Sequence, residues 1–138
     1  MAVPAPLKTA VERRTGFLVT AHANPDGDAV GSAVALGWVL RALGKDVTVY
    51  IDGGLPPHFD WLALPCPFLA EPPEALPEAV AVLDCGNAQR LGPALVERLN
   101  ESFVINIDHH LGNPLFGDEN WVDTRYPAVG GIDRKSTR

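Results

Sequence analysis

Six histidine and aspartate side chains of this chain follow short apolar segments and could together hold metal ions. They are His22, Asp26, Asp28, Asp84, His109 and His110. Each group comes after an apolar, β-branched run of the kind that forms a buried strand. Because ligands bind beyond the carboxyl ends of the strands in an open parallel sheet, these side chains can converge although they are distant in the sequence.

Carboxylates crowded at one edge of a sheet repel one another, and each is driven toward protonation. Divalent cations remove this repulsion, and one bridging carboxylate can hold two cations about 3.5–4 Å apart. Carboxylate and imidazole ligands without a thiolate suit manganese or magnesium and tolerate cobalt, iron or zinc. The imidazoles favour manganese, because magnesium prefers oxygen and water. Such a cation pair activates water and stabilises charge on phosphate, so the pattern indicates phosphoryl chemistry.

Each of these residues also has an ordinary structural explanation. Asp28 could cap the helix that follows it, Asp26 before Gly27 could form a turn, and Asp84 could simply close a strand. A single histidine is more often a surface or core residue than a ligand. It is their joint placement after predicted strands that favours a metal centre.

The apolar pattern predicts an α/β fold with a Rossmann-like, mostly parallel sheet and helices on both faces. Strands are expected at 16–21, 46–52, 78–86 and 102–110, with short ones around Phe68 and at 120–123. A helix should run from Asp28 to about Leu43, a shorter one over 93–99, and one helical turn near 59–62. The first strand, helix and strand predict a right-handed parallel crossover.

Composition restricts the class of protein. The 138 residues are 46% hydrophobic and carry a net charge of -6, which argues against binding duplex DNA through a basic face. No run of eighteen apolar residues suggests a membrane span, and no secretory signal is evident. Cys66 and Cys85 are too few for a disulfide framework. We therefore expect a cytoplasmic protein with reduced thiols.

Three motifs carry a resemblance to a known family. They are "HANPDGDAVGS" at 22–32, "VLDCG" at 82–86 and "DHH" at 108–110. In this order and spacing they resemble the first three motifs of the DHH phosphoesterase superfamily. The segment "DHHLGNPLFGDENWVD" at 108–123 is most similar to the branch of nanoRNases, pAp phosphatases and cyclic-dinucleotide phosphodiesterases. The resemblance implies a substrate that is a short oligonucleotide or nucleotide phosphate, and possible pairing into a homodimer.

The resemblance also implies roles for individual residues. Two Mn²⁺ ions are expected, with Mg²⁺ or Co²⁺ as substitutes: His22 and Asp26 would bind the first, Asp28 and His109 the second, and Asp84 would bridge them. His110 would contact the scissile phosphate and act as general acid. Asp108 would orient a histidine ligand. Asn24 and Arg90 are candidates for substrate contact.

The resemblance stops near Val129. Members of the family continue with a helix, a fourth motif that supplies another aspartate, and a smaller substrate-binding domain. We therefore predict an incomplete catalytic domain over 1–129 and an atypical tail over 130–138, either vector-derived or disordered. Two alternatives remain: an inorganic pyrophosphatase or exopolyphosphatase, which "FGDENWVD" argues against, and an inactive metal-binding fragment. A dinucleotide-binding module is disfavoured because its glycine fingerprint is absent.

Overall fold

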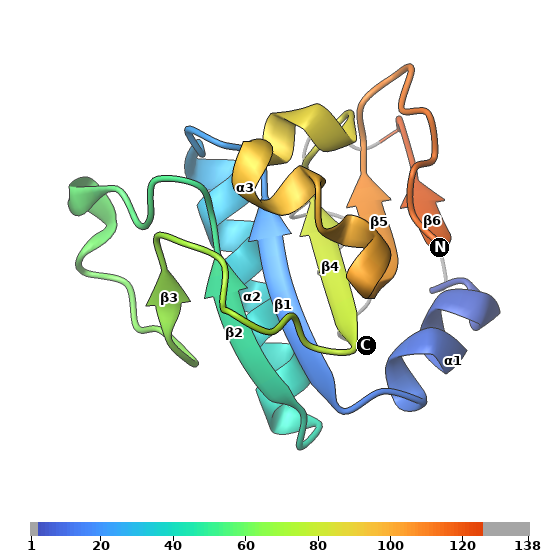
Figure 1. Ribbon diagram of the computed structural model, residues 1–138, viewed down its shortest axis with the longest axis horizontal. Coiled ribbons are helices and arrows are strands. Elements are labelled where there is room, and N and C mark those ends of the chain that lie inside the picture. The colour runs from blue at the N-terminus through green and yellow to red at the C-terminus, as the bar shows by residue number, and fades with distance from the viewer. Residues whose placement is uncertain (1–2, 126–138) are drawn as a thin grey trace.

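The computed structural model describes residues 3–125 of the chain, which form a parallel sheet with helices packed on it (Figure 1). The tail predicted over 130–138 lies outside the described residues. The helices are α1 (Ala5–Glu12), α2 (Gly27–Ala42) and α3 (Pro93–Val96), with short 3₁₀ helices at Pro57–Phe59, Ala88–Leu91 and Leu99–Glu101. The strands are β1 (Gly16–Ala21), β2 (Asp46–Tyr50), β3 (Phe68–Leu69), β4 (Ala79–Leu83), β5 (Phe103–Asp108) and β6 (Glu119–Val122).

The six-stranded sheet has the order β3-β2-β1-β4-β5-β6, and each neighbouring pair is parallel. The chain moves outward from β1 to β2 and β3, and then returns to the other side of β1 to build β4, β5 and β6. Between β1 and β4 the direction of winding therefore reverses, which is where open α/β sheets bind ligands. In Figure 1 the arrowheads of β1, β4 and β5 point to the same edge. This arrangement confirms the predicted Rossmann-like α/β fold.

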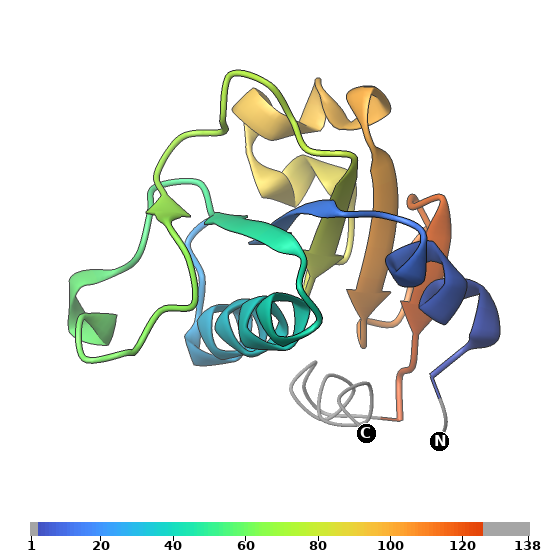
Figure 2. The ribbon, with the colours of Figure 1, turned by 90° about the horizontal axis from the view of Figure 1, so that it is seen from below.

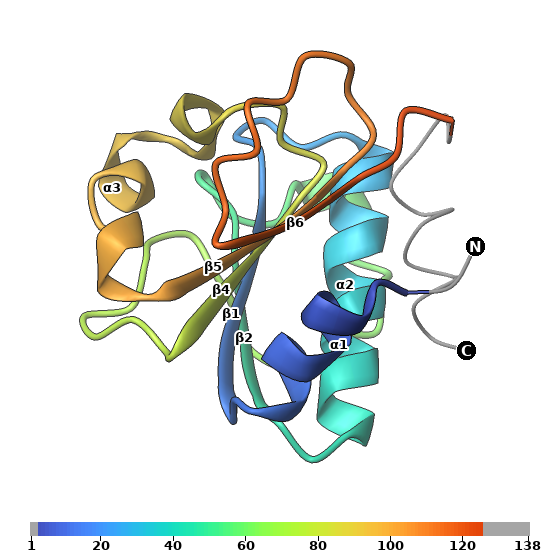
Figure 3. The same cartoon turned by 90° about the vertical axis from the view of Figure 1, so that its right-hand side faces the viewer.

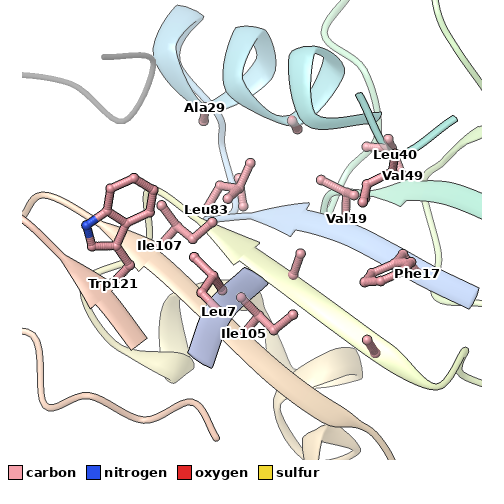
Figure 4. Packing of buried hydrophobic residues seen from close by; sticks show 14 of the residues in the cluster. Leu7, Phe17, Val19, Ala29, Leu40, Val49, Leu83, Ile105, Ile107 and Trp121 are labelled. Atoms are coloured by element: carbon pink, nitrogen blue, oxygen red, sulfur yellow. The ribbon is translucent and has the colours of Figure 1, made fainter. Parts of the chain in front are cut away.

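Side chains alternate between two cores because both faces of the central strands are covered. Helices α1 and α2 lie on one face and α3 on the other, as Figures 2 and 3 show. Phe17 and Val19 of β1 pack toward α2, whereas Leu18 joins the core on the α3 side. Figure 4 shows the first of these cores, where Val19 and Val49 of the strands lie beside Leu40 of α2, and Leu83 and Ile105 extend the same cluster. The central strands are thus fixed from both sides, and their ends are held in place.

Several local details differ from the sequence prediction. Asp26, not Asp28, caps α2: it is extended at φ −88° and ψ −176°, and its side chain accepts the Ala29 N–H. The prediction failed because the cap lies two residues earlier than expected, so the helix begins at Gly27 and Asp28 falls in its first turn. Helix α3 ends at Val96 instead of residue 99, and the 3₁₀ turn lies at Pro57–Phe59 instead of 59–62.

Helix α1 was not predicted, because Pro4 and Pro6 interrupt its sequence. In the structure these prolines lie at the helix cap and in its first turn, where a missing N–H costs nothing. Leu7 and Ala10 of this helix are buried against the sheet. Across residues 3–125, none of the helices combines the length and apolar character that a bilayer crossing requires.

Candidate metal centre

The predicted ligands meet at the carboxyl ends of β1, β4 and β5. His22 follows β1, Asp84 follows β4, and Asp108 is the last residue of β5. These three strands are neighbours in the sheet. A backbone hydrogen bond of 3.1 Å from the Asp84 N–H to the Ile107 carbonyl joins the ends of β4 and β5, and one of 2.7 Å from the Ala23 N–H to the Arg90 carbonyl ties the loop after β1 to the 3₁₀ helix Ala88–Leu91. The sheet therefore brings together residues that are more than eighty positions apart in the sequence.

Asp84 lies at the middle of the cluster, between two imidazoles. Its Oδ1 is 3.0 Å from Nε2 of His109, and its Oδ2 is 3.4 Å from Nε2 of His22. Only 3% of the residue is exposed. Its backbone has φ 53°, a left-handed conformation that is uncommon for residues other than glycine. Strain of this kind concentrates at functional sites. Each carboxylate oxygen of Asp84 thus faces a different histidine.

His22 presents its Nε2 atom to the cluster. Its Nδ1 is 2.8 Å from the carbonyl oxygen of Ala23, so Nδ1 carries the proton and donates this bond. Its Nε2 then offers a lone pair, and it lies 3.9 Å from Oδ1 of Asp26. One ligand atom each from His22, Asp26 and Asp84 falls within 4.8 Å of the others. These three residues match the set expected for the first ion.

Asp28 lies in the first turn of α2, near enough for its charge to act on Asp84, but it is in neither of the two groups of potential ligand atoms within 4.8 Å found among residues 3–125. Its Oδ1 accepts a hydrogen bond of 3.2 Å from the hydroxyl of Ser32, one helical turn later. Burial raises the pKa of Asp84, and the negative charges of Asp28 and Asp26 raise it further against the opposing effect of the two histidines. Carboxylates that repel one another in a buried position call for a compensating cation.

The distances within the cluster fit ligands of a common ion. Two atoms bound at about 2.0–2.2 Å and separated by roughly 90–110° at the ion lie about 3.0–3.5 Å apart. The contacts of Asp84 with His109 and His22, at 3.0 and 3.4 Å, are of this length. Cys85 adds no thiolate, because burial raises the pKa of its thiol to about 12. The donor set is therefore imidazole and carboxylate, which suits manganese.

Asp108 and His110 bond to each other next to Asp84 and His109, and one potential ligand atom from each of these four residues lies within 4.8 Å of the others. Nδ1 of His110 donates to Oδ1 of Asp108 at 2.6 Å and is 3.9 Å from Oδ1 of Asp84. Burial alone would raise the pKa of Asp108, but hydrogen bonds from Asn113, His110 and the His109 backbone outweigh it and keep the pKa below its usual value. The carboxylate of Asp108 thus bonds to the ring of His110, the expected general acid, whereas it meets His109 through the backbone N–H. The pair directs Nε2 of the ring away from Asp108.

Asn24 and Arg90 lie on loops near the cluster without joining it. Asn24 is exposed in the loop after β1 and has a left-handed backbone with φ 53°. Arg90 is exposed in the 3₁₀ helix Ala88–Leu91, and only its carbonyl is tied to the loop of His22. Within residues 3–125 we find no hydrogen bond or ion pair from either side chain. Both are available to a substrate, and their roles remain predictions.

The sequence interpretation missed Asn113, which donates to Oδ2 of Asp108 at 2.8 Å. An asparagine before Pro114, in the loop after two candidate histidines, is a recognisable signal for a side chain that organises a turn. That signal indicates the turn, but it does not reveal the contact with Asp108.

The sequence and structure are similar to those of known proteins over the region that contains the three motifs. Residues 16–137 match the model of the DHH family, N-terminal domain. The chain belongs to the DHH family. It is 38% identical over 112 residues to the bifunctional oligoribonuclease and PAP phosphatase NrnA of Thermus thermophilus, covering 80% of this chain and 33% of that protein. It is 32% identical to the probable bifunctional oligoribonuclease and PAP phosphatase NrnA of Streptococcus mutans, over 84% of this chain and 36% of that protein.

The DHH-family chain thus spans about a third of the length of these curated relatives. Among solved structures, an exopolyphosphatase-related protein from Bacteroides fragilis superposes with a TM-score of 0.77 at 19% identity, covering 93% of this chain and 40% of that one. This likeness confirms the fold. The family match confirms the resemblance that the motifs at 22–32, 82–86 and 108–110 indicated.

Proposed function

We propose that this chain is the metal-binding catalytic domain of a manganese-dependent phosphoesterase that hydrolyses short oligoribonucleotides or pAp. The observation that carries the proposal is the position of Asp84 between His22 and His109, with the charges of Asp26 and Asp28 beside it. The similarity to two NrnA proteins, named as oligoribonucleases and PAP phosphatases, supports the substrate class.

In this proposal His22, Asp26 and Asp84 would hold one Mn²⁺ ion, and Asp28, Asp84 and His109 would hold another. When bound, such ions lower the pKa of water and neutralise charge on the phosphate. Because Asp84 belongs to both sets of ligands, it would hold the two ions close to each other. The Asp84 N–H donates to the Ile107 carbonyl of β5, which helps to hold Asp84 in place between the two histidines.

His110 acts on the leaving group. Its Nδ1 is committed to Asp108, which leaves Nε2 to donate a proton to the departing oxygen as the P–O bond breaks. Asp108 stabilises the charged ring and keeps its orientation. Arg90 and Asn24, exposed on the neighbouring loops, contact the phosphates or sugar of the substrate. The side chain of Arg90 supplies a positive charge that an anionic substrate requires in this acidic chain.

Incubation of the chain with Mn²⁺ and either a diribonucleotide or pAp tests the proposal. Release of mononucleotide or inorganic phosphate is the expected result, with no release in the presence of a chelator. The Asp84→Asn variant is the matched control, since it keeps the size of the side chain and removes the shared charge.

Two other results would overturn this proposal. Phosphate release from pyrophosphate or polyphosphate, without turnover of either nucleotide, would indicate the alternative enzyme class considered from the sequence. Calorimetry that detects Mn²⁺ binding, together with no turnover of any of these substrates, would identify a metal-binding domain that is inactive by itself.

A further inference from the structure

The side chain of Asn113 uses its full hydrogen-bonding capacity beside the candidate active site. Its Nδ2 donates to Oδ2 of Asp108 at 2.8 Å and, over a longer distance of 3.4 Å, to the carbonyl of Cys85. Its Oδ1 accepts from Nδ2 of Asn106 at 3.1 Å and from the Leu115 N–H at 2.7 Å. An amide has two donor hydrogens and two acceptor lone pairs, so the orientation of Asn113 is fully determined.

These bonds connect the parts of the chain that carry the reactive groups. Cys85 follows Asp84 at the end of β4, whereas Asp108 ends β5 and holds His110. Asp108 has two carboxylate oxygens: Oδ1 accepts from His110 and Oδ2 accepts from Asn113. Because both oxygens have a fixed donor, the carboxylate cannot rotate without breaking a bond. The ring of His110 is thereby held in one direction.

Asn106, which donates to Asn113, is buried with one polar atom unpaired within residues 3–125, so the orientation of Asn113 costs some stability. Asn106 is fully buried on β5, and its Nδ2 donates to the side-chain oxygens of both Asn113 and Asn120. Its own Oδ1 has no hydrogen-bond partner among the described residues. A buried acceptor without a partner is unfavourable. The fold tolerates it in an arrangement in which Nδ2 of Asn106 donates to Asn113 of the loop and to Asn120 of β6.

The loop after His110 is shaped to accept this arrangement. Asn120 on β6 pairs with the backbone of Gly117 through its side-chain oxygen and nitrogen, both at 2.9 Å. A Cβ atom added to Gly117 would lie 2.9 Å from the Glu119 carbonyl and 3.0 Å from Cβ of Asn106, which is too close. The return from β5 to β6 is therefore packed tightly against Asn106.

We propose that Asn113 is a positioning residue that clamps the Asp108 carboxylate and so holds His110 in the direction in which it meets the leaving group. The inference rests on the function proposed above. Asn113 touches none of the predicted metal ligands through its side chain in the described structure. It acts on turnover through Asp108 and His110, and not on metal affinity.

The test compares the Asn113→Ala variant with a matched control, Asn120→Ala. Both remove a side-chain amide that contacts Asn106, one in the loop after His110 and one on β6, but only Asn113 contacts Asp108. We expect Asn113→Ala to lower kcat roughly 10- to 100-fold, the range typical of partners that orient reactive groups. KM and the dissociation constant for Mn²⁺ should remain within about twofold, and Asn120→Ala should keep kcat within about threefold of the parent.

A second readout needs neither metal nor substrate. In the metal-free protein labelled with ¹⁵N-histidine, the Nδ1–H of His110 should give a hydrogen-bonded proton signal, assigned by its absence from His110→Gln. Exchange of this proton with water should accelerate in Asn113→Ala and remain slow in Asn120→Ala. If Asn113→Ala does not fold, Asn113→Asp takes its place, since it keeps the acceptor bonds with Leu115 and Asn106. It removes the donors to Asp108 and to the Cys85 carbonyl and places a second carboxylate beside Asp108, so the clamp is lost.

An unchanged His110 signal together with kcat close to that of the parent would overturn the proposal. Loss of Mn²⁺ affinity in parallel with kcat would also overturn it, because Asn113 would then support the metal ligands. If the parent protein turns over no nucleotide, the proposed function fails, and the proton signal still decides whether Asn113 holds His110.

Discussion

The amino ends of β1 and β5 are held by favourable contacts, whereas the carboxyl ends of β1, β4 and β5 bring like charges together. At the amino ends, Oε1 of Glu78 accepts the N–H groups of Thr15 and Gly16 at 3.1 and 3.4 Å. The guanidinium of Arg14 lies 3.6 Å above the centre of the Phe103 ring. At the carboxyl ends, burial and two neighbouring aspartates raise the pKa of Asp84.

This difference indicates that the two edges of the sheet serve different purposes. The amino edge and the two cores contribute stability, whereas the carboxyl edge lowers it by crowding carboxylates, whose repulsion a bound cation or a proton relieves. Changes at the carboxyl edge should therefore affect activity far more than folding, and changes at the amino edge should do the reverse. The following variants test that separation, from the largest expected effect to the smallest.

Asp84→Asn should have the largest effect on activity, because one residue serves both predicted ions. The loss should exceed the roughly 10²–10⁴-fold contribution of a single positioned acid. The amide can still accept from His109 and donate to His22, so the metal-free protein should fold. Thermal unfolding with and without Mn²⁺ checks this: the parent should gain stability from the ion, and the variant should gain little. Activity close to that of the parent would exclude a bridging role.

The same variant predicts a pH dependence in the metal-free protein. Because the pKa of Asp84 is raised in the folded state, that state binds a proton more tightly than the unfolded chain. The favourable contribution is complete below the ordinary carboxyl pKa of about 3.9 and is lost as the pH rises. The free energy of unfolding of Asp84→Asn, relative to the parent, should therefore increase between pH 4 and 7. A difference that shrinks over this range would contradict the sign of the shift.

His110→Ala should separate catalysis from metal binding. Removing a general acid lowers turnover by roughly 10²-fold or more, while the Mn²⁺ affinity should stay within about twofold because the ligand set is intact. Parallel measurement of kcat and of Mn²⁺ binding by calorimetry provides the check. A large loss of affinity would make His110 a ligand, as its place in a cluster with Asp84, Asp108 and His109 would permit.

Glu78→Ala examines the amino edge. It removes the acceptor for the Thr15 and Gly16 N–H groups in an exposed position, so the free energy of unfolding should fall by about 0.5–1.5 kcal/mol. Turnover and Mn²⁺ affinity should remain those of the parent. Denaturant unfolding and calorimetry measure the two properties separately. A loss of metal affinity would show that the two edges are not independent.

Asn106→Leu should produce the smallest change in stability. The substitution removes the unpaired buried oxygen, and Asn113 and Asn120 retain the Leu115 and Gly117 N–H groups as donors. The free energy of unfolding should therefore be unchanged or higher by up to about 1 kcal/mol. The value of kcat should fall, because Asn113 loses the Asn106 donor that helps to orient it toward Asp108. A strongly destabilised variant would show that the hydrogen bonds of Asn106 are needed for folding, and not only for the orientation of Asn113.

The strands of the sheet could be predicted from the sequence because their apolar runs are short and bounded by polar residues. The strand expected at 16–21 has those bounds, and the clustering of His22, Asp84 and His109 followed from the parallel sheet. Local detail was harder to predict. Two aspartates flank Gly27, and either could cap a helix, so the pattern alone could not distinguish Asp26 from Asp28.

Contacts made by single polar side chains were the least predictable. Asn113 can donate to Asp108 because β5, the following loop and β6 pack around Asn106. Likewise, Asp108 lies next to His109 and two residues before His110. The conformation of the loop decides which of the two imidazole rings bonds to its carboxylate. Residue types and spacing identify the chemistry of such a site, but the partner of each atom is decided by tertiary packing.

A crystal structure of the protein soaked with Mn²⁺, with anomalous scattering used to locate the ions, tests the central claim most directly. The account predicts two ions that share Asp84, one bound by His22 and Asp26 and the other by Asp28 and His109. Mn²⁺ bound elsewhere, or a single ion held by Asp108 and His110, would contradict it.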